Sequence, residues 1–162
     1  MLWQVGPAHA GDRPALAALF TACSPETVRL RFFGRLKQWP REYLDAALAG
    51  RPAEHDAVVA YRPGRTDLLG LASLATPSDA GPGIGELGVL VADDWQRQGV
   101  GTAMIDLLLS RARDRGLERV AATVLPSRSK LLAALTRRLE RDGPGLRSRD
   151  GLTGVYKLAP RA

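Results

Sequence analysis

Two hydrophobic periods divide the sequence into strands and helices. Short apolar runs bounded by glycine, proline or aspartate predict β-strands, and apolar positions that recur roughly every three to four residues predict helices. The predicted strands are Trp3–Val5, Ala57–Tyr61, Leu68–Leu74, Glu86–Ala92, Val120–Leu125, Leu146–Ser148 and Leu152–Leu158. The predicted helices are one that opens at Asp12 and Pro14, then Pro25–Phe33, a short one from Pro40, Gly99–Arg115 and Arg128–Arg141. Ser24 is the predicted N-cap of the second helix, with Pro25 at its first position. Asp79–Gly85, rich in glycine and proline, is predicted to be a loop.

The order of these elements predicts the fold. A strand–helix–strand unit at the centre, Glu86–Ala92, Gly99–Arg115 and Val120–Leu125, implies two parallel strands with a right-handed crossover. Short turns on either side imply antiparallel strands. We therefore expect an α/β protein with a mixed, mostly antiparallel sheet of about six to seven strands, a central parallel pair and helices on both faces. The length of 162 residues fits one domain over residues 1–162.

Composition narrows the class of protein. Hydrophobic residues make up 45% of the chain and charged residues 25%, which is ordinary for a globular domain. No apolar run reaches the roughly 18 residues of a membrane span, and the N-terminus lacks a secretory layout, so we expect a cytoplasmic protein with no membrane partner. Cys23 is the only cysteine, and the two histidines, His9 and His55, are far apart, so we expect no disulfide and no metal. Cys23 is predicted to pack in the core, and both histidines to lie on the surface or in turns.

Positive charge is concentrated in the second part of the chain. Residues 1–94 carry 9 basic and 11 acidic side chains, whereas residues 95–162 carry 14 basic and 6 acidic ones. Such a field attracts an anion: nucleic acid, an anionic membrane surface or a phosphate-bearing cofactor. Nucleic acid is disfavoured as a partner, because residues 95–162 offer only Trp95 and Tyr156 for base stacking. Solubility alone would also account for the charge.

The most informative segment runs from a strand through a glycine turn into a helix. Gly99 and Gly101 let the backbone approach a ligand closely, and the free amides of a helix start favour an anion. Arg97 adds a positive charge. The Gly-Lys-Ser/Thr of a Walker loop is absent, and Met104 stands where a dinucleotide fingerprint needs its third glycine. The alternatives that remain are another phosphate-binding loop and a tight turn that merely needs glycine.

Two motifs carry a resemblance to a known family. The hexapeptide Gln96–Gly101, Gln-Arg-Gln-Gly-Val-Gly, resembles the coenzyme A loop of the GNAT superfamily of acyl-CoA-dependent N-acyltransferases. The decapeptide Ser24–Phe33, Ser-Pro-Glu-Thr-Val-Arg-Leu-Arg-Phe-Phe, resembles a helix of the Pat-type protein lysine acetyltransferases, a branch of that superfamily. Asp94–Gln96 and the strand with Glu86 are similar to the same branch. With the element order, the resemblance covers nearly the whole chain.

This resemblance implies a function and a set of site residues. It implies that acetyl-CoA is the co-substrate, with no metal, and that the acceptor is a primary amine of a protein lysine or of a small molecule. Glu86, at the start of the strand that leads into the coenzyme loop, is the implied general base. The residues implied to pair with the pantetheine arm are Val89, Leu90 and Val91. The residues implied to hold the pyrophosphate are Gln96, Arg97, Gln98, Gly99, Val100, Gly101 and Thr102.

The sequence departs from the family after the predicted strand Val120–Leu125. GNAT enzymes often carry an asparagine there and a general-acid tyrosine on the following helix, but this chain has no asparagine and no tyrosine between residues 62 and 155. Ser127 or Ser129 would replace the asparagine as a donor to the coenzyme, with Ser129 the predicted site residue, or both serines would only cap the following helix. Tyr156 either reaches the thiolate from the last strand or packs in the core. Two hypotheses therefore stay open: an acetyltransferase, and a non-catalytic acyl-CoA-binding sensor or scaffold. A homodimer stays open as well.

Overall fold

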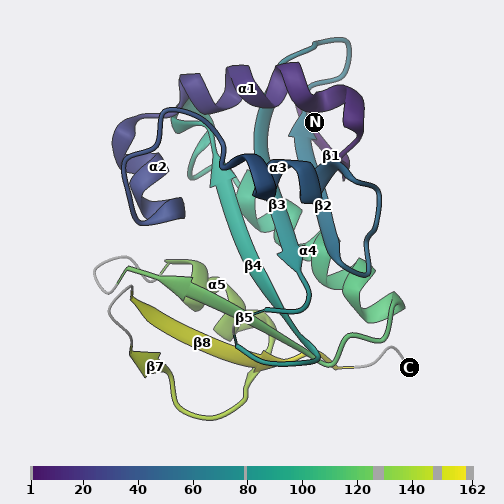
Figure 1. Cartoon of the computed structure of the whole chain (residues 1–162), viewed down its shortest axis with the longest axis vertical. Coiled ribbons are helices and arrows are strands. Elements are labelled where there is room, and N and C mark those ends of the chain that lie inside the picture. Colours follow the sequence, from purple (N-terminus) through teal and green to yellow (C-terminus); the bar gives the residue numbers. More distant parts are fainter. Residues whose placement is uncertain (1, 79, 126–129, 148–150, 160–162) are drawn as a thin grey trace.

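The computed structural model describes residues 2–78, 80–125, 130–147 and 151–159, and their strands form one sheet. The strand order is β1–β2–β3–β4–β5–β8–β6, and β7 also pairs with β8 (Figure 1). The strands are β1 Gln4–Pro7, β2 His55–Tyr61, β3 Leu68–Ala75, β4 Ile84–Val91, β5 Arg119–Val124, β6 Glu140–Arg141, β7 Leu146–Arg147 and β8 Leu152–Lys157. Only β4 and β5 are parallel among these strands, so the predicted mixed sheet with a central parallel pair is confirmed.

Helices cover both faces of the sheet. One face carries α1 Arg13–Ala22, α2 Pro25–Phe32 and α3 Arg41–Leu48, and the other carries α4 Val100–Asp114 and α5 Lys130–Arg138. Two short 3-10 turns, η1 Ala10–Asp12 and η2 Asp93–Trp95, precede α1 and α4. No helix in the described ranges combines the length and the apolar composition that crossing a membrane requires.

Local sequence explains the bounds of α2. The Ser24 hydroxyl accepts a hydrogen bond from the Thr27 amide at 3.2 Å, and Pro25 occupies the first helical position, where its missing N–H costs nothing. The helix ends at Phe32 because Phe33 adopts a left-handed conformation with φ of 63°. The cap predicted from the sequence is confirmed, and it fixes where α2 meets the sheet.

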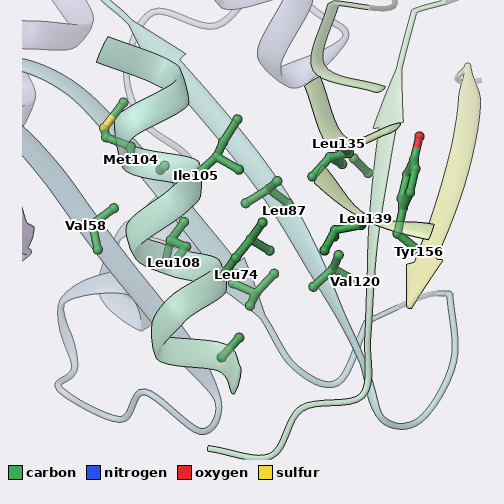
Figure 2. Packing of buried hydrophobic residues seen from close by; sticks show 14 of the residues in the cluster. Val58, Leu74, Leu87, Met104, Ile105, Leu108, Val120, Leu135, Leu139 and Tyr156 are labelled. Carbon is green, nitrogen blue, oxygen red and sulfur yellow. The ribbon is translucent and has the colours of Figure 1, made fainter. Parts of the chain in front are cut away.

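Alternation along the strands divides the core into two clusters. In β2, Val58 packs toward α4 and Val59 packs toward α1, since successive strand side chains point to opposite faces. Figure 2 shows the cluster on the α4 side, to which Leu74, Leu87 and Leu108 belong. The sheet is therefore buried on both faces.

Several predicted boundaries are wrong, and strand pairing explains three of them. β4 begins at Ile84, inside the predicted loop, because Ile84 and Gly85 pair with β5. β2 begins at His55, which pairs with Ala75 of β3. The predicted last helix ends early, at Arg138, because residues 140–141 pair with the edge of β8 as β6. The predicted start of that helix at Arg128 lies outside the described residues.

Candidate active site

A cleft opens where β4 and β5 separate. β4 pairs with β5 only over residues 84–86, whereas it pairs with β3 as far as Val91. The two parallel strands diverge in a V (Figure 1), and within the described residues the edge of β4 beyond Glu86 has no partner strand on that side. The cleft has a volume of about 630 Å³ and is lined by α2 and α3 on one face of the sheet and by α4 and α5 on the other. Free backbone groups of β4 therefore face a space that is open to ligands.

Glu86 lies at the point of this V. It is the third residue of β4, opposite Ala75 of β3 and Ala121 of β5, and its half-buried side chain lines the cleft. The prediction that Glu86 begins the strand is wrong, because β4 extends to Ile84 through its pairing with β5. A carboxylate at this position can accept a proton from a group that is bound where the strands part.

The glycine turn forms one end of the cleft. Gly99 caps α4 in the left-handed conformation with φ of 86°, and Arg97 has φ of 63°. The first helical hydrogen bond of α4 joins the Ala103 N–H to the Gly99 carbonyl at 3.0 Å, so the amides of residues 100–102 have no helical acceptor. These amides, the positive end of the helix dipole and the Arg97 cation together favour an anion at this end.

Gly101 leaves room in the cleft that the fold itself does not need. A Cβ atom at this position would lie 3.6 Å from side-chain carbons of Val89 and Val91, which is ordinary van der Waals contact. The backbone at Gly101 is regular helix with negative φ, so glycine is not required by conformation. The space beside Gly101 is therefore available for a ligand.

Polar side chains tie the turn to α2. The Asp93 carboxylate accepts a hydrogen bond from the Ser24 N–H at 2.9 Å, and Gln96 Nε2 donates to Thr27 Oγ1 at 3.1 Å and to the Val91 carbonyl at 3.0 Å. Burial alone would raise the pKa of Asp93, but hydrogen bonds from Ser24 and Thr27 outweigh it and lower the pKa. The carboxylate thus stays ionised, and the Gln96 side chain positions the turn through protein contacts.

Most of the predicted site residues line the cleft. They are Glu86, Val89, Leu90, Val91, Gln96, Arg97, Gly99, Gly101 and Thr102. The Gln98 side chain instead donates to the Asp94 carbonyl at 3.0 Å, and Val100 is buried in the core. Val100 can therefore offer an anion only its backbone groups, and the Gln98 side chain is directed to Asp94. Ser129 lies outside the described residues, and the contacts of all these residues with a coenzyme stay predictions.

Three polar side chains that line the cleft on the side of α2 and α3, Arg31, Tyr43 and Ser73, were not predicted from the sequence. The Tyr43 and Ser73 hydroxyl oxygens lie 2.6 Å apart in a hydrogen bond. The Arg31 guanidinium lies flat against Gly88, where any Cβ atom would overlap with it. A glycine inside an apolar strand marks a close approach of another group, and that signal was present in β4.

Tyr156 and Cys23 do not serve the cleft. Tyr156 is 1% exposed and its hydroxyl donates to the Leu132 carbonyl at 3.1 Å, so the alternative that places Tyr156 in the core is confirmed. Burial, assisted by the negative charge of Asp93, raises the pKa of the Cys23 thiol to about 11. Because little thiolate exists at neutral pH, Cys23 is a packing residue, as predicted.

The prediction that His55 lies at the surface or in a turn is wrong. His55 is 7% exposed, its ring meets the Tyr43 ring edge-on with centroids 5.2 Å apart, and its Nε2 atom has no hydrogen-bond partner. Burial and the positive charge of Arg31 lower the pKa of His55, and the neighbouring Asp56 opposes this shift. The lowered pKa therefore favours the neutral imidazole in the folded state.

This burial predicts a pH dependence of stability. Because the folded-state pKa of His55 is lowered, its contribution is fully present above the unfolded pKa of about 6.5 and is lost as the pH falls toward the folded-state pKa. In urea denaturation between about pH 5 and 7.5, the free energy of unfolding of His55→Phe should fall less steeply with decreasing pH than that of the wild type. Equal slopes below pH 6.5 would mean that His55 is charged in the folded protein.

A sheet whose central parallel strands part beside a glycine turn is the architecture of a coenzyme A-dependent acyltransferase. The model of the acetyltransferase (GNAT) family matches residues 14–139, and the chain belongs to this family. The chemistry of the family is acyl transfer from acyl-CoA to amines. No curated protein matches the chain.

Solved structures show the same fold. The GNAT domain of S. lividans PAT superposes with a TM-score of 0.82 at 20% identity, over 96% of this chain and 90% of that one. A ribosomal-protein-alanine N-acetyltransferase from Brucella melitensis has a TM-score of 0.68 at 20% identity, over 95% and 98%. A phosphinothricin acetyltransferase from Sinorhizobium meliloti, solved in complex with AcCoA, has a TM-score of 0.69 at 16% identity, over 97% and 88%. The predicted GNAT fold is thereby confirmed.

Proposed function

We propose that this protein transfers an acetyl group from acetyl-CoA to a primary amine, with Glu86 as the general base. The observation that carries the proposal is the position of Glu86 at the point where β4 leaves β5, in the same cleft as the glycine turn. Acetyl-CoA supplies an activated thioester. The free β4 edge and the uncapped amides at the start of α4 fit its extended pantetheine arm and its pyrophosphate, respectively.

The residues of the chain divide the work along the cleft. Val89–Val91 would hold the pantetheine arm through backbone groups, and Gln96–Thr102 would hold the pyrophosphate, with Arg97 adding charge. Glu86 would accept the proton of the attacking amine directly or through a water. Holding the amine and the thioester side by side removes most of the entropic cost of their encounter.

The leaving thiolate has no tyrosine beside it on the coenzyme side. Of the three tyrosines, Tyr43 alone lines the cleft, and its hydroxyl is engaged by Ser73 on the α2 and α3 side. A thiol has an unperturbed pKa of about 8.5, so its anion is a good leaving group near neutral pH. We therefore propose that the thiolate departs without a protein acid.

The proposed function is tested by two measurements on the purified protein. Calorimetry should show binding of acetyl-CoA, and coenzyme A should be released in the presence of a panel of small amines and a lysine peptide. The resemblance of Ser24–Phe33 to the Pat-type helix supports a protein lysine. The similarity to a ribosomal-protein-alanine N-acetyltransferase and to a phosphinothricin acetyltransferase supports an amine of a protein or of a small molecule. Binding of acetyl-CoA without turnover of any amine would favour the acyl-CoA sensor instead.

Replacing Gly101 with aspartate should weaken coenzyme binding in a protein that still folds. The new side chain has room against Val89 and Val91, and it would place a negative charge where the pyrophosphate is proposed to sit. We expect calorimetry to show a loss of affinity for acetyl-CoA on the order of 100-fold, the equivalent of about 2.7 kcal/mol.

Gly11→Asp is the matched control for this experiment. It adds the same charge at an exposed position where a Cβ atom would meet nothing within 4 Å. Its affinity for acetyl-CoA should equal that of the wild type. If the Gly101→Asp protein also keeps wild-type affinity, the pyrophosphate is not bound at the glycine turn.

A further inference from the structure

Arg31 is an arginine inside the cleft that forms no ion pair among the described residues. It comes from α2, lines the cleft and is half-buried. Its Nε atom is buried without a hydrogen-bond partner, and no ion pair joins its guanidinium to a carboxylate of the described residues. By contrast, Arg62, whose Nε atom is also buried without a hydrogen-bond partner, pairs with Asp67, and Arg111 pairs with Asp56. Burial of an unpaired guanidinium is costly, so this position calls for an anion from outside the fold.

The surroundings hold the guanidinium in one place. Its Cζ atom lies 4.5 Å from the centre of the Phe32 ring and 5.0 Å from the centre of the Tyr43 ring, so two aromatic rings support the cation. The absence of a side chain at Gly88 lets the guanidinium rest on β4 itself. An arginine held in this way is preorganised to bind a carboxylate through two parallel hydrogen bonds.

Arg31 is on the acceptor side of the sheet and not on the pyrophosphate side. Gly88 and Leu90 face α2 and the cluster under α1–α3, whereas Val89 and Val91 face α4 and pack beside Gly101. The glycine turn and Arg31 therefore contact opposite faces of β4. The anion that Arg31 would bind is therefore not the pyrophosphate of the coenzyme.

Glu86 lies on the same face as Gly88, two residues away along β4, which is roughly 7 Å. If Glu86 receives the proton of the amine, a carboxylate bound to Arg31 is only a few carbon atoms from that amine. The short distance between Glu86 and Arg31 suits an amino acid, in which the amine and the carboxylate are close together. It is too short for a protein substrate in which a lysine ε-amine at Glu86 and a carboxylate at Arg31 are far apart along the chain.

We infer that the acceptor is a small amine that carries a carboxylate close to its amino group, an amino-acid-like compound, and that Arg31 binds this carboxylate. This inference rests on the proposed function and names the class of acceptor for the same site. Arg31 is then a specificity-determining residue, and Tyr43 and Gly88 position its guanidinium.

The test compares amines that differ only in the carboxylate. Coenzyme A release is measured with a set of α-amino acids and β-alanine, each beside its carboxamide, for the wild type and for Arg31→Gln. Because each compound is compared with itself in the two proteins, differences in the acidity of the amines cancel. The carboxylate-to-carboxamide ratio of kcat/KM should fall about 10- to 100-fold in Arg31→Gln, the loss of a bidentate charged contact.

Three variants separate this role from a merely structural one. Arg29→Gln removes a charge from the same helix at an exposed arginine that pairs with Glu26, and it should leave the ratio unchanged. Arg31→Lys keeps a charge without the planar fork and should recover part of the ratio. Gly88→Ala leaves Arg31 in the sequence but displaces its guanidinium, and it should lower the ratio as Arg31→Gln does.

A binding measurement keeps the inference independent of turnover. N-acetylglycine and N-acetylglycinamide are titrated into the protein with coenzyme A present, and only the former should bind in a manner that Arg31→Gln weakens. If no amine is acetylated but this binding is seen, the proposed function fails and the carboxylate site stands. If amines or a lysine peptide are acetylated with a ratio that Arg31→Gln does not change, the carboxylate site is wrong and the proposed function stands.

Discussion

Replacing Glu86 with glutamine is expected to lower turnover by about 10²–10⁴-fold, the usual loss when general-base assistance is removed. Glutamine keeps the size of the side chain but accepts no proton at neutral pH. The affinity for acetyl-CoA should change little, because the proposed coenzyme contacts lie on backbone groups further along β4 and at the glycine turn. Stopped-flow or steady-state release of coenzyme A and calorimetry measure the two quantities.

The size of the expected effect follows from the acidity of amines. An ammonium group with an unperturbed pKa of about 10.4 must lose its proton before it can attack, which costs roughly 4–5 kcal/mol at pH 7. A base at the point of the V offsets part of this cost. The loss in Glu86→Gln should therefore shrink as the pH rises and the amine deprotonates unaided.

Glu54→Gln provides the matched control. Glu54 has the same chemistry, but its side chain is 68% exposed and pairs with Arg51 away from the cleft. Its turnover should match the wild type. Near-wild-type turnover of Glu86→Gln at about pH 7, with an acceptor that the wild type uses, would show that the proton goes elsewhere.

Replacing Asp56 with alanine should cause a large loss of stability. The Asp56 side chain is 3% exposed and accepts hydrogen bonds from Arg111 Nε at 2.8 Å, Arg111 Nη2 at 2.9 Å and Arg115 Nη1 at 3.0 Å. These bonds connect the start of β2 to the C-terminal end of α4. Breaking a buried ion pair of this kind costs about 2–4 kcal/mol, at the lower part of the usual range because both arginines reach solvent.

Thermal and urea unfolding check this prediction. A loss of that size corresponds to a Tm lower by roughly 5–15 °C in a chain of this length. Asp45→Ala removes a similar ion pair with Arg13 in which both side chains are about half exposed, and it should change the free energy of unfolding by less than about 0.5 kcal/mol. If the two variants lose equal stability, the burial of the Asp56 cluster contributes nothing.

Local features of the sequence were enough to predict most of the elements. Three such features are the apolar periods, the Ser24–Pro25 cap of α2 and the glycines at the start of α4. Each depends on residues within one or two helical turns of one another, where steric and hydrogen-bond rules act directly. The same is true of the strand–turn–helix unit that carries the proposed coenzyme site. The element order then allowed the mixed sheet to be inferred.

Boundaries that depend on strand pairing were predicted less well. Ile84 and Gly85 look like loop residues by composition, yet they belong to β4 because β5 pairs with them. Residues 140–141 continue a helical pattern, yet β8 draws them into the sheet as β6. In both cases the partner strand supplies hydrogen bonds that no local pattern reveals.

The sequence by itself determined the family, the glycine turn and the presence of a carboxylate in the strand before it, since these depend on neighbouring residues. Only the tertiary structure decided how far β4 and β5 stay paired, and therefore that Glu86 lies where they part. It also decided contacts between residues far apart in the chain: Gln96 reaches Thr27, 69 positions away, and Arg31 rests on Gly88. Such contacts follow from the packing of α2 across the sheet, which depends on the shapes of both cores at once and leaves no periodic signal in the chain.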